Sequence, residues 1–210
     1  LMEAGREKGL KRVIFASTGG AIYGEQETFP CDEQHRRRPV SPYGVSKLAT
    51  EAYLLFYKMQ YGIDYVALRY SNVYGPRQDP HGEAGVVAIF CARILSRQSC
   101  TIYGDGEQTR DYVYVGDVAR ANVAALNTPA SGPFNIGTGV ETSVNELFRL
   151  LAKIAGTDEP ARYAPMRPGE QRRSVISAAR AAAELGWQPQ VPLDEGLKRT
   201  FESFKSNSGT

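Results

Sequence analysis

The sequence predicts an α/β fold with a parallel sheet, and three observations support this prediction. Two mostly apolar runs of strand length lie at 12–16 and 64–70. Between them, residues 42–61 carry apolar side chains at helical spacing. A strand, a helix and a second buried strand in this order form one parallel crossover unit. Beyond residue 80, short strand-like and helical segments are mixed, which indicates a smaller mixed α/β region.

The first half of the chain carries strong signals for where its elements begin and end. Residues 1–8 have the character of the end of a helix, and Gly9 closes it. Ser41 is a favoured N-cap for the long helix, Pro42 is favoured at its first position, and Gly62 suits its C-terminus. The apolar residues at helical spacing within it are Val45, Leu48, Ala49, Ala52, Leu55, Phe56 and Met59.

The elements of the second half are shorter. We expect helices at 85–97, 117–126, 143–155, 178–185 and 193–204, and strands at 101–103, 110–115 and 134–136. Asp117 is the predicted N-cap of its helix, and Ser143 with Glu146 forms a capping-box pattern. The irregular segment 75–82 predicts a boundary near residue 80.

Composition and charge exclude several classes of protein. The 210 residues are 42% hydrophobic and 23% charged, which is ordinary for a globular chain, and the net charge of +2 is too small to indicate a nucleic acid partner. No apolar run approaches the ~18 residues that cross a membrane, so no membrane association is expected. The three cysteines and two histidines show no metal-ligand spacing. We expect no metal site, and reduced thiols in a cytoplasmic protein.

The sharpest feature for chemistry is Tyr43 followed by Lys47 four residues later. On a helix this spacing places both side chains on one face. A lysine ammonium there favours the ionised phenol, and so does the first turn of a helix. The phenol is therefore suited to act as a general base. Because the chain holds twelve tyrosines, the spacing taken alone favours two surface residues.

Ser17 and Thr18 follow the strand at 12–16, at the edge where open α/β sheets bind ligands. A hydroxyl there can share a substrate proton with the phenol of Tyr43. By themselves the two residues also fit an ordinary turn ahead of Gly19 and Gly20. Their combination with the tyrosine and lysine is far more specific than either feature alone.

Four segments together resemble the successive signatures of the extended short-chain dehydrogenases/reductases, in the NAD-dependent epimerase/dehydratase family. They are 15–24, 41–47, 68–77 and 104–112, in this order. Within the family the chain most resembles the UDP-glucose 4-epimerase branch, over residues 9–196. This resemblance implies the C-terminal part of a Rossmann-type parallel sheet, together with a smaller mixed α/β substrate-binding domain.

The resemblance implies a role for each matching residue. Tyr43 becomes the catalytic base and acid, Lys47 its electrostatic partner and a contact to the cofactor ribose, and Thr18 the catalytic hydroxyl. Ser17 and Tyr70 fall near the nicotinamide half of the cofactor, NAD.

The implied contacts to the UDP-sugar substrate begin with Thr18 and divide by the part that they bind. For the diphosphate they are Asn72, Arg110 and Arg167, the guanidinium fork being suited to this task; for the uridine they are Thr101, Tyr103 and Glu170. Ser174 falls in the sugar pocket, where its small side chain leaves room for a 2-acetamido group. Taken singly, the two arginines also fit surface ion pairs.

The implied reaction is epimerisation at C4 of a UDP-hexose through a transient 4-keto intermediate, with NAD as hydride acceptor. One alternative is a dehydratase of the same superfamily, but that branch has carboxylates directly after the threonine, where this chain has Gly19 and Gly20. A decarboxylase or a reductase of the superfamily also remains open. An alternative of another class is a non-catalytic fragment or binding module.

The chain departs from the family pattern in one respect, because no GxGxxG or GxxGxxG occurs in it. By the family's layout, roughly the first hundred residues, with the glycine-rich turn that binds the pyrophosphate, are absent. We expect residues 1–80 to be the C-terminal half of the NAD-binding domain, to which later segments also contribute, and 81–210 to be mainly substrate-binding. The 210 residues alone are expected to bind NAD poorly and to be inactive. The complete protein is expected to form a homodimer through the helix at 42–61.

Overall fold

The computed structural model describes residues 1–82, 85–166, 169 and 171–207. The helices are α1 (Met2–Glu7), α2 (Pro42–Tyr61), α3 (Val86–Leu95), α4 (Val115–Leu126), α5 (Val144–Ala155), α6 (Ala179–Leu185) and α7 (Leu193–Asn207). The strands are β1 (Arg12–Thr18), β2 (Asp64–Tyr70), β3 (Asn72–Tyr74), β4 (Thr101–Tyr103), β5 (Thr109–Arg110), β6 (Tyr112–Tyr114), β7 (Gly132–Ile136), β8 (Thr142–Ser143), β9 (Arg162–Ala164) and β10 (Arg173–Ser174). The predicted α/β class is confirmed.

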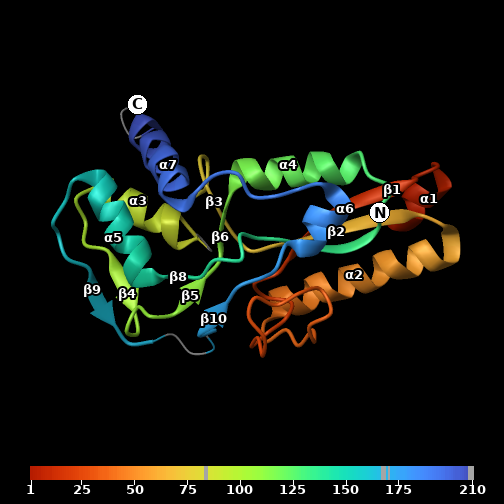
Figure 1. The fold of residues 1–210 in the computed structure, drawn as a ribbon, viewed down its shortest axis with the longest axis horizontal. Helices are drawn as coiled ribbons and strands as arrows, with labels where there is room; N and C mark the ends of the chain where they lie inside the picture. The colour runs from red at the N-terminus through yellow and green to blue at the C-terminus, as the bar shows by residue number, and fades with distance from the viewer. Residues whose placement is uncertain (83–84, 167–168, 170, 208–210) are drawn as a thin grey trace.

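A parallel sheet in the order β1-β2-β7 forms one end of the molecule (Figure 1). The helix α2 connects β1 to β2, as the sequence predicts for a crossover unit. The strand β7 comes from beyond residue 130, so a late segment of the chain also belongs to this sheet. Because all three strands run in the same direction, their carboxyl ends meet at one edge.

Helices cover both faces of this sheet. Since side chains alternate along a strand, β2 presents Tyr65 and Ala67 to α2, where Leu54 packs on them. It presents Val66 and Leu68 to the opposite side, which α4 and α6 cover; the core there also includes Val118, Phe134 and Trp187. Burial on both faces explains why β2 is almost continuously apolar.

A second core lies between α3, α5 and α7 at the other end of the molecule (Figure 1). Its buried side chains include Phe90, Leu147, Leu151 and Phe201. The short strands of this half pair as β4 with β9, β3 with β6, and β5 between β10 and β8. None of the helices within the described ranges is long and apolar enough to span a bilayer.

The predicted caps of two helices are confirmed. The side chain of Ser41 accepts a hydrogen bond from the Gly44 amide at 3.1 Å, and that of Ser143 accepts one from the Glu146 amide at 3.1 Å. Gly62 ends α2 with a left-handed φ of 68°, a conformation that favours glycine.

Two predictions near residue 115 are wrong. The expected strand at 110–115 is divided at Asp111 into β5 and β6, and α4 already begins at Val115. Asp117 therefore lies inside the first turn of α4 and is not its N-cap. Its buried carboxylate accepts hydrogen bonds from the amides of Gln190 and Val191, both at 3.1 Å. The carboxylate thus holds a distant segment, a contact that local sequence does not reveal.

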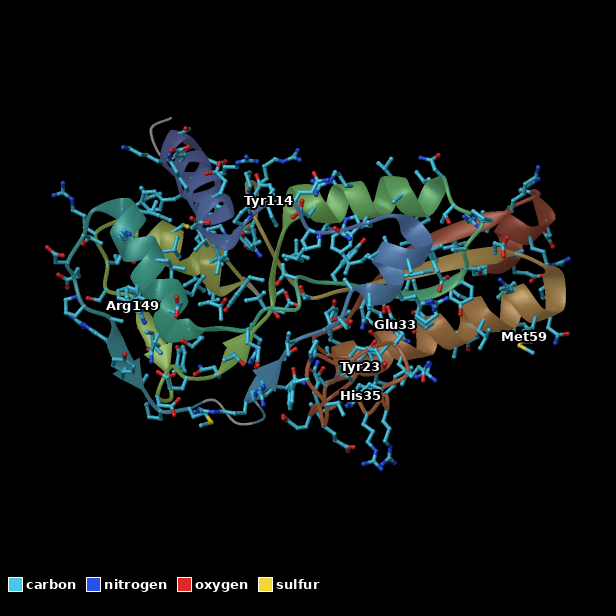
Figure 2. The ribbon with its side chains drawn as sticks, in the orientation of Figure 1. Tyr23, Glu33, His35, Met59, Tyr114 and Arg149 are labelled. Atoms are coloured by element: carbon cyan, nitrogen blue, oxygen red, sulfur yellow. The ribbon has the colours of Figure 1, made fainter. Side chains whose placement is uncertain are left out.

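The apolar stripe of α2 points away from the sheet. The residues of α2 buried on the sheet side are Gly44, Glu51 and Leu54. By contrast, Val45, Phe56 and Met59 are 53%, 48% and 72% exposed, and Figure 2 shows Met59 near the C-terminal end of the helix. Helical spacing of apolar residues usually indicates the core face. Here the face on the sheet carries a buried carboxylate beside Leu54. Of the apolar stripe, Leu48 packs partly buried against the Ile22 cluster, and the other positions are left at the surface.

Candidate active site

The carboxyl edge of the sheet brings Thr18 and Tyr70 together, because the two residues pair at the ends of β1 and β2. The Thr18 hydroxyl accepts a hydrogen bond from the Ala21 amide at 3.2 Å. The phenol of Tyr70 contacts the side-chain amide of Asn122, which donates to it at 2.9 Å. Burial raises the pKa of Tyr70, and the Asn122 hydrogen bond only partly opposes this. Tyr70 therefore stays protonated at neutral pH and is unsuited to act as a base.

Tyr43 and Lys47 lie in the first two turns of α2, and Lys47 reaches back to the end of β1. Its Nζ donates to the carbonyl oxygen of Ala16 at 2.8 Å and lies 5.5 Å from the centre of the Tyr43 ring. Tyr43 itself is 53% exposed, so its phenol is open to a ligand. The spacing of the two residues predicts one helix face, and the structure brings them together there.

Ser17 is directed differently from Thr18. Its hydroxyl donates to the carboxylate of Glu51 on α2 at 2.6 Å. Adjacent residues of a strand point to opposite faces, so this side chain lies under α2 rather than on the Thr18 side. The structure therefore joins Ser17 to the helix that carries Tyr43 and Lys47.

A cavity of about 300 Å³ gathers four of the residues that the sequence assigns to the nucleotide. They are Asn72, Thr101, Tyr103 and Arg110. The cavity lies between α3 and the short strands, beside the second core. Thr101 is held by Arg93, whose Nη1 donates to its hydroxyl at 3.3 Å, and Arg110 Nη1 donates to the Thr109 carbonyl oxygen at 2.8 Å.

Asn72 also connects this cavity to the edge of the sheet. A Cβ placed on Gly20 would lie 3.7 Å from Asn72 Oδ1 and 4.0 Å from the hydroxyl oxygens of both Thr18 and Ser174. Ser174 pairs with Arg110 between β10 and β5, and it is buried. Three polar groups from distant segments thus surround the space above Gly20. The candidate active site therefore combines Thr18, Asn72 and Ser174 around Gly20 with the cavity that Asn72 lines, while the Tyr43–Lys47 pair is attached to Ala16, two residues before Thr18.

Two predicted contacts, Arg167 and Glu170, lie outside the described residues. Sequence reasoning overlooked Glu51 and Arg69, which form a buried ion pair below the site with Arg69 Nη2 and Glu51 Oε2 2.6 Å apart. A signal was available, because Arg69 is a charged residue that directly follows the apolar run 65–68 of β2. Glu51 also continues the four-residue spacing of Tyr43 and Lys47.

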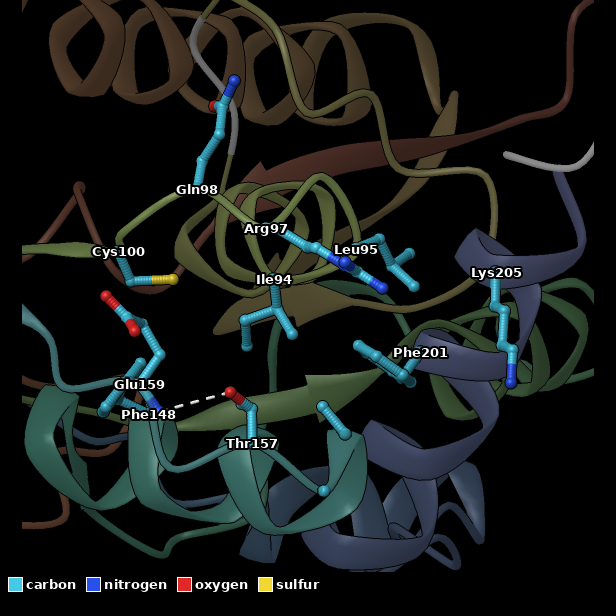
Figure 3. Close-up of a pocket in the computed structure, with 12 residues that line it drawn as sticks. Ile94, Leu95, Arg97, Gln98, Cys100, Phe148, Thr157, Glu159, Phe201 and Lys205 are labelled. Atoms are coloured by element: carbon cyan, nitrogen blue, oxygen red, sulfur yellow. Dashed lines mark hydrogen bonds between the residues drawn. The ribbon is translucent and has the colours of Figure 1, made fainter.

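A larger cavity of about 590 Å³ opens between α3, α5 and α7 (Figure 3). Its walls include Ile94, Phe148 and Phe201, with Arg97 and Lys205 toward solvent. Among the residues that the structure describes, none of those predicted for catalysis or binding lines it. We therefore assign the chemistry to the smaller site at the sheet edge.

Comparison with known proteins gives consistent results. The family described as the NAD dependent epimerase/dehydratase family matches residues 1–137. The UDP-glucose 4-epimerase of Mycolicibacterium smegmatis is 47% identical over 209 residues, which cover 99% of this chain and 67% of that protein. The crystal structure of the UDP-glucose 4-epimerase of Thermotoga maritima with UDP-glucose superposes with a TM-score of 0.97 at 52% identity, covering 99% of this chain and 68% of the other. The crystal structure of the Thermus thermophilus UDP-glucose 4-epimerase complex with NAD superposes with a TM-score of 0.90 at 47% identity, covering 98% of this chain and 67% of the other.

Proposed function

The chain belongs to the NAD-dependent epimerase/dehydratase family, and we propose that it carries the catalytic and substrate-binding residues of a UDP-glucose 4-epimerase. The observation that supports this most is an arrangement at the carboxyl edge of the sheet: the Tyr43–Lys47 pair is attached to Ala16, and Thr18 shares the space above Gly20 with Asn72, which lines the nucleotide cavity. It provides a proton acceptor at one end and a place for a nucleotide at the other.

In this proposal Tyr43 removes the proton from the sugar 4-hydroxyl and later returns it to the 4-keto oxygen. Lys47 stabilises the phenolate electrostatically, because its ammonium lies beside the Tyr43 ring. Thr18 holds the reacting oxygen from the opposite side with its hydroxyl. Exchange of a proton at a positioned tyrosine of this kind is general acid–base catalysis.

The residues at the sheet edge fit an NAD cofactor. An ammonium has three N–H donors, and the Ala16 carbonyl oxygen takes one from Lys47, which leaves donors for ribose hydroxyls and for Tyr43. Tyr70, at the end of the neighbouring strand, offers a protonated phenol near the nicotinamide. When bound, NAD supplies a reversible hydride acceptor for C4 of the sugar.

The nucleotide is proposed to lie in the 300 Å³ cavity. Arg110 and Asn72 face the diphosphate, and Thr101 and Tyr103 face the uridine. A guanidinium fork suits a diphosphate because it donates two parallel, charge-assisted hydrogen bonds. Arg167 and Glu170, outside the described residues, keep their roles as sequence predictions.

Two observations bear on the alternatives. Gly19 and Gly20 follow Thr18, so the carboxylates that the dehydratase branch carries there are missing. A non-catalytic binding module would have no need of the exposed Tyr43 beside Lys47 at a strand edge.

We further propose that the sheet with its helices serves the cofactor and the core of α3, α5 and α7 serves the substrate. The cysteines are unpaired and buried, which supports a reducing, cytoplasmic location.

The function is tested by incubating the complete protein with NAD and UDP-glucose. Proton NMR is expected to show conversion to a mixture with the C4 epimer, while NAD is not consumed. Loss of the 6-hydroxyl from the sugar would instead indicate the dehydratase. A protein that binds UDP-glucose and converts none of it would be a binding module.

Ser174 is proposed to determine which sugars enter. Because serine is small, a 2-acetamido group finds room, and the complete enzyme is expected to epimerise UDP-N-acetylglucosamine as well as UDP-glucose. Ser174→Tyr is expected to lower kcat/KM for the N-acetylated sugar at least ~10-fold more than for UDP-glucose, because the added ring fills that space. Ser174→Ala, which keeps the space, should leave the ratio near that of wild type. The proposal fails if wild type ignores the N-acetylated sugar or if the tyrosine leaves the ratio unchanged.

The exposed stripe of α2 is proposed to join two copies of the protein as a homodimer. Contiguous exposed apolar side chains, here Val45, Phe56 and Met59, commonly mark such an interface. Light scattering of the complete protein at tens of micromolar is expected to give the mass of a dimer, and Phe56→Lys to shift it toward the monomer. Tyr163→Lys replaces a ring outside the stripe that is even more exposed, at 61%, and should have no effect. A wild-type monomer would contradict the proposal.

A further inference from the structure

A row of buried polar side chains crosses the sheet one residue before its carboxyl edge. Ser17, Arg69 and Asn135 are aligned across β1, β2 and β7. All three are buried, with exposed fractions of 3%, 0% and 0%. The row lies under α2, on the face opposite to α4 and α6. Polar groups in a dry core are costly unless they are hydrogen-bonded, so their partners matter.

The partners of this row join it to two other parts of the molecule. Arg69 Nε and Nη2 donate to the two carboxylate oxygens of Glu51 at 3.0 and 2.6 Å, and the Ser17 hydroxyl donates to the same carboxylate at 2.6 Å. Arg69 Nη1 donates to the Tyr23 phenol at 2.9 Å, and that phenol donates to Asn135 Oδ1 at 2.6 Å. Figure 2 labels Tyr23 in the loop beside α2. The row thus ties both α2 and the loop after Thr18 to the sheet.

Glu51 has a specific place on α2. It follows Tyr43 and Lys47 at the same four-residue interval, so the three residues occupy successive turns of one face. Lys47 is attached to Ala16 and Glu51 to Ser17, which are consecutive residues of β1. Thr18 is the next residue. Two attachments, one turn apart, therefore set the position of the Tyr43 helix relative to Thr18.

An apolar interface would fix the position of α2 on the sheet less narrowly than this polar row does. Packing of apolar side chains is non-directional, whereas a bidentate guanidinium–carboxylate pair has one favoured geometry. A buried ion pair adds little stability over a well-packed apolar pair of the same volume. Its use here, below the catalytic residues, therefore needs a reason other than stability. At the helix start, a Cβ on Gly44 would lie 2.7 Å from the Ala21 carbonyl oxygen, so α2 also fits closely against the loop after Thr18.

We propose that Glu51, Arg69 and Ser17 are positioning residues, which hold α2 in the register that sets Tyr43 and Lys47 opposite Thr18. The expected effect on kcat rests on the proposed function, whereas the expected effect on the attachment of α2 to the sheet rests on geometry alone. The residues act through Tyr43 and Lys47, so a change in them affects the chemical step more than the binding of the UDP-sugar. Misplacing a catalytic group by about 1 Å can cost up to ~100-fold in rate.

The decisive variant is the double substitution Glu51→Leu with Arg69→Met in the complete enzyme. It replaces the ion pair by apolar side chains of similar size, so the fold is expected to be retained. We expect kcat for epimerisation to fall ~10- to 100-fold while KM for UDP-glucose changes less than about twofold. Ser17→Ala, which keeps the ion pair, is expected to lower kcat about tenfold, and Ser17→Thr, which keeps the hydroxyl, to restore it.

A second measurement does not depend on activity. Hydrogen exchange of the backbone amides of residues 46–52 is expected to become roughly tenfold faster in Ser17→Ala, because one attachment of α2 is lost. Tyr23→Phe is the matched control, since it keeps the ring and removes a hydroxyl whose hydrogen bonds go to Arg69 and Asn135 of the row rather than to α2. Its amides in that segment should exchange as in wild type.

The outcomes separate the two proposals. A wild type without epimerase activity would contradict the proposed function, and the exchange measurement would still decide about positioning. An active wild type whose folded double variant keeps its kcat would overturn the positioning role. The positioning role would also be overturned if the amides of residues 46–52 exchanged in Ser17→Ala as in wild type. The same holds if the lower activity of Ser17→Ala came only from weaker NAD binding. If the double variant does not fold, the Ser17 variants decide.

Discussion

Replacing Tyr43 by phenylalanine in the complete enzyme is expected to lower kcat for epimerisation at least ~100-fold, the usual scale for a positioned general acid–base group. The substitution removes one hydroxyl from a side chain that is 53% exposed, so the fold is expected to survive. KM for the UDP-sugar should change little, because the residues proposed to bind the nucleotide lie in the cavity beyond Asn72. The measurement is steady-state kinetics with UDP-glucose, together with circular dichroism to verify folding.

Tyr53→Phe provides the matched control for this experiment. Tyr53 lies on the same helix and is 66% exposed, but it is far along α2 from Thr18. Its variant should turn over as fast as wild type. A folded Tyr43→Phe enzyme with wild-type kcat would show that another group accepts the proton and would overturn the proposed mechanism.

The parts of this site that could be predicted from sequence are those determined by local rules. The position of α2 follows from Ser41, Pro42 and Gly62, each of which has a fixed preference at a helix end. The position of Tyr43 beside Lys47 then follows from helical spacing alone. The alignment of Thr18 with Tyr70 follows because consecutive parallel strands end at the same edge of a sheet.

The parts that could not be predicted depend on contacts between distant segments. Nothing near Asp117 indicates that its carboxylate binds the amides of Gln190 and Val191. Likewise, the direction of the apolar stripe on α2 is decided by Glu51, whose partner Arg69 lies on another element. A periodic pattern identifies a helix, but it does not say which of two faces meets the core when a charged residue can be buried with a counter-charge.

The second large effect is expected from Glu51→Ala, which should lower the free energy of unfolding by about 3–5 kcal/mol. Arg69 is fully buried, and its guanidinium would then lack a counter-charge. Burial alone lowers the pKa of Arg69, but the hydrogen bonds and the charge of Glu51, with the Tyr23 phenol, outweigh burial and raise it above its usual value. The variant removes the Glu51 contribution, but an arginine guanidinium keeps its proton at all accessible pH values, so Arg69 cannot escape the penalty by losing it. The measurement is urea unfolding of the complete protein.

Glu195→Ala tests whether burial is the cause. Glu195 pairs with Arg199 at 2.8 Å, but the two side chains are 45% and 50% exposed, so water replaces the lost partner. Its removal should cost no more than about 0.5 kcal/mol. The double variant Glu51→Leu with Arg69→Met should also unfold near the wild-type midpoint, since neither charge remains buried. If Glu51→Ala were as stable as Glu195→Ala, water would have to reach Arg69, and the dry polar row under α2 would not exist in solution.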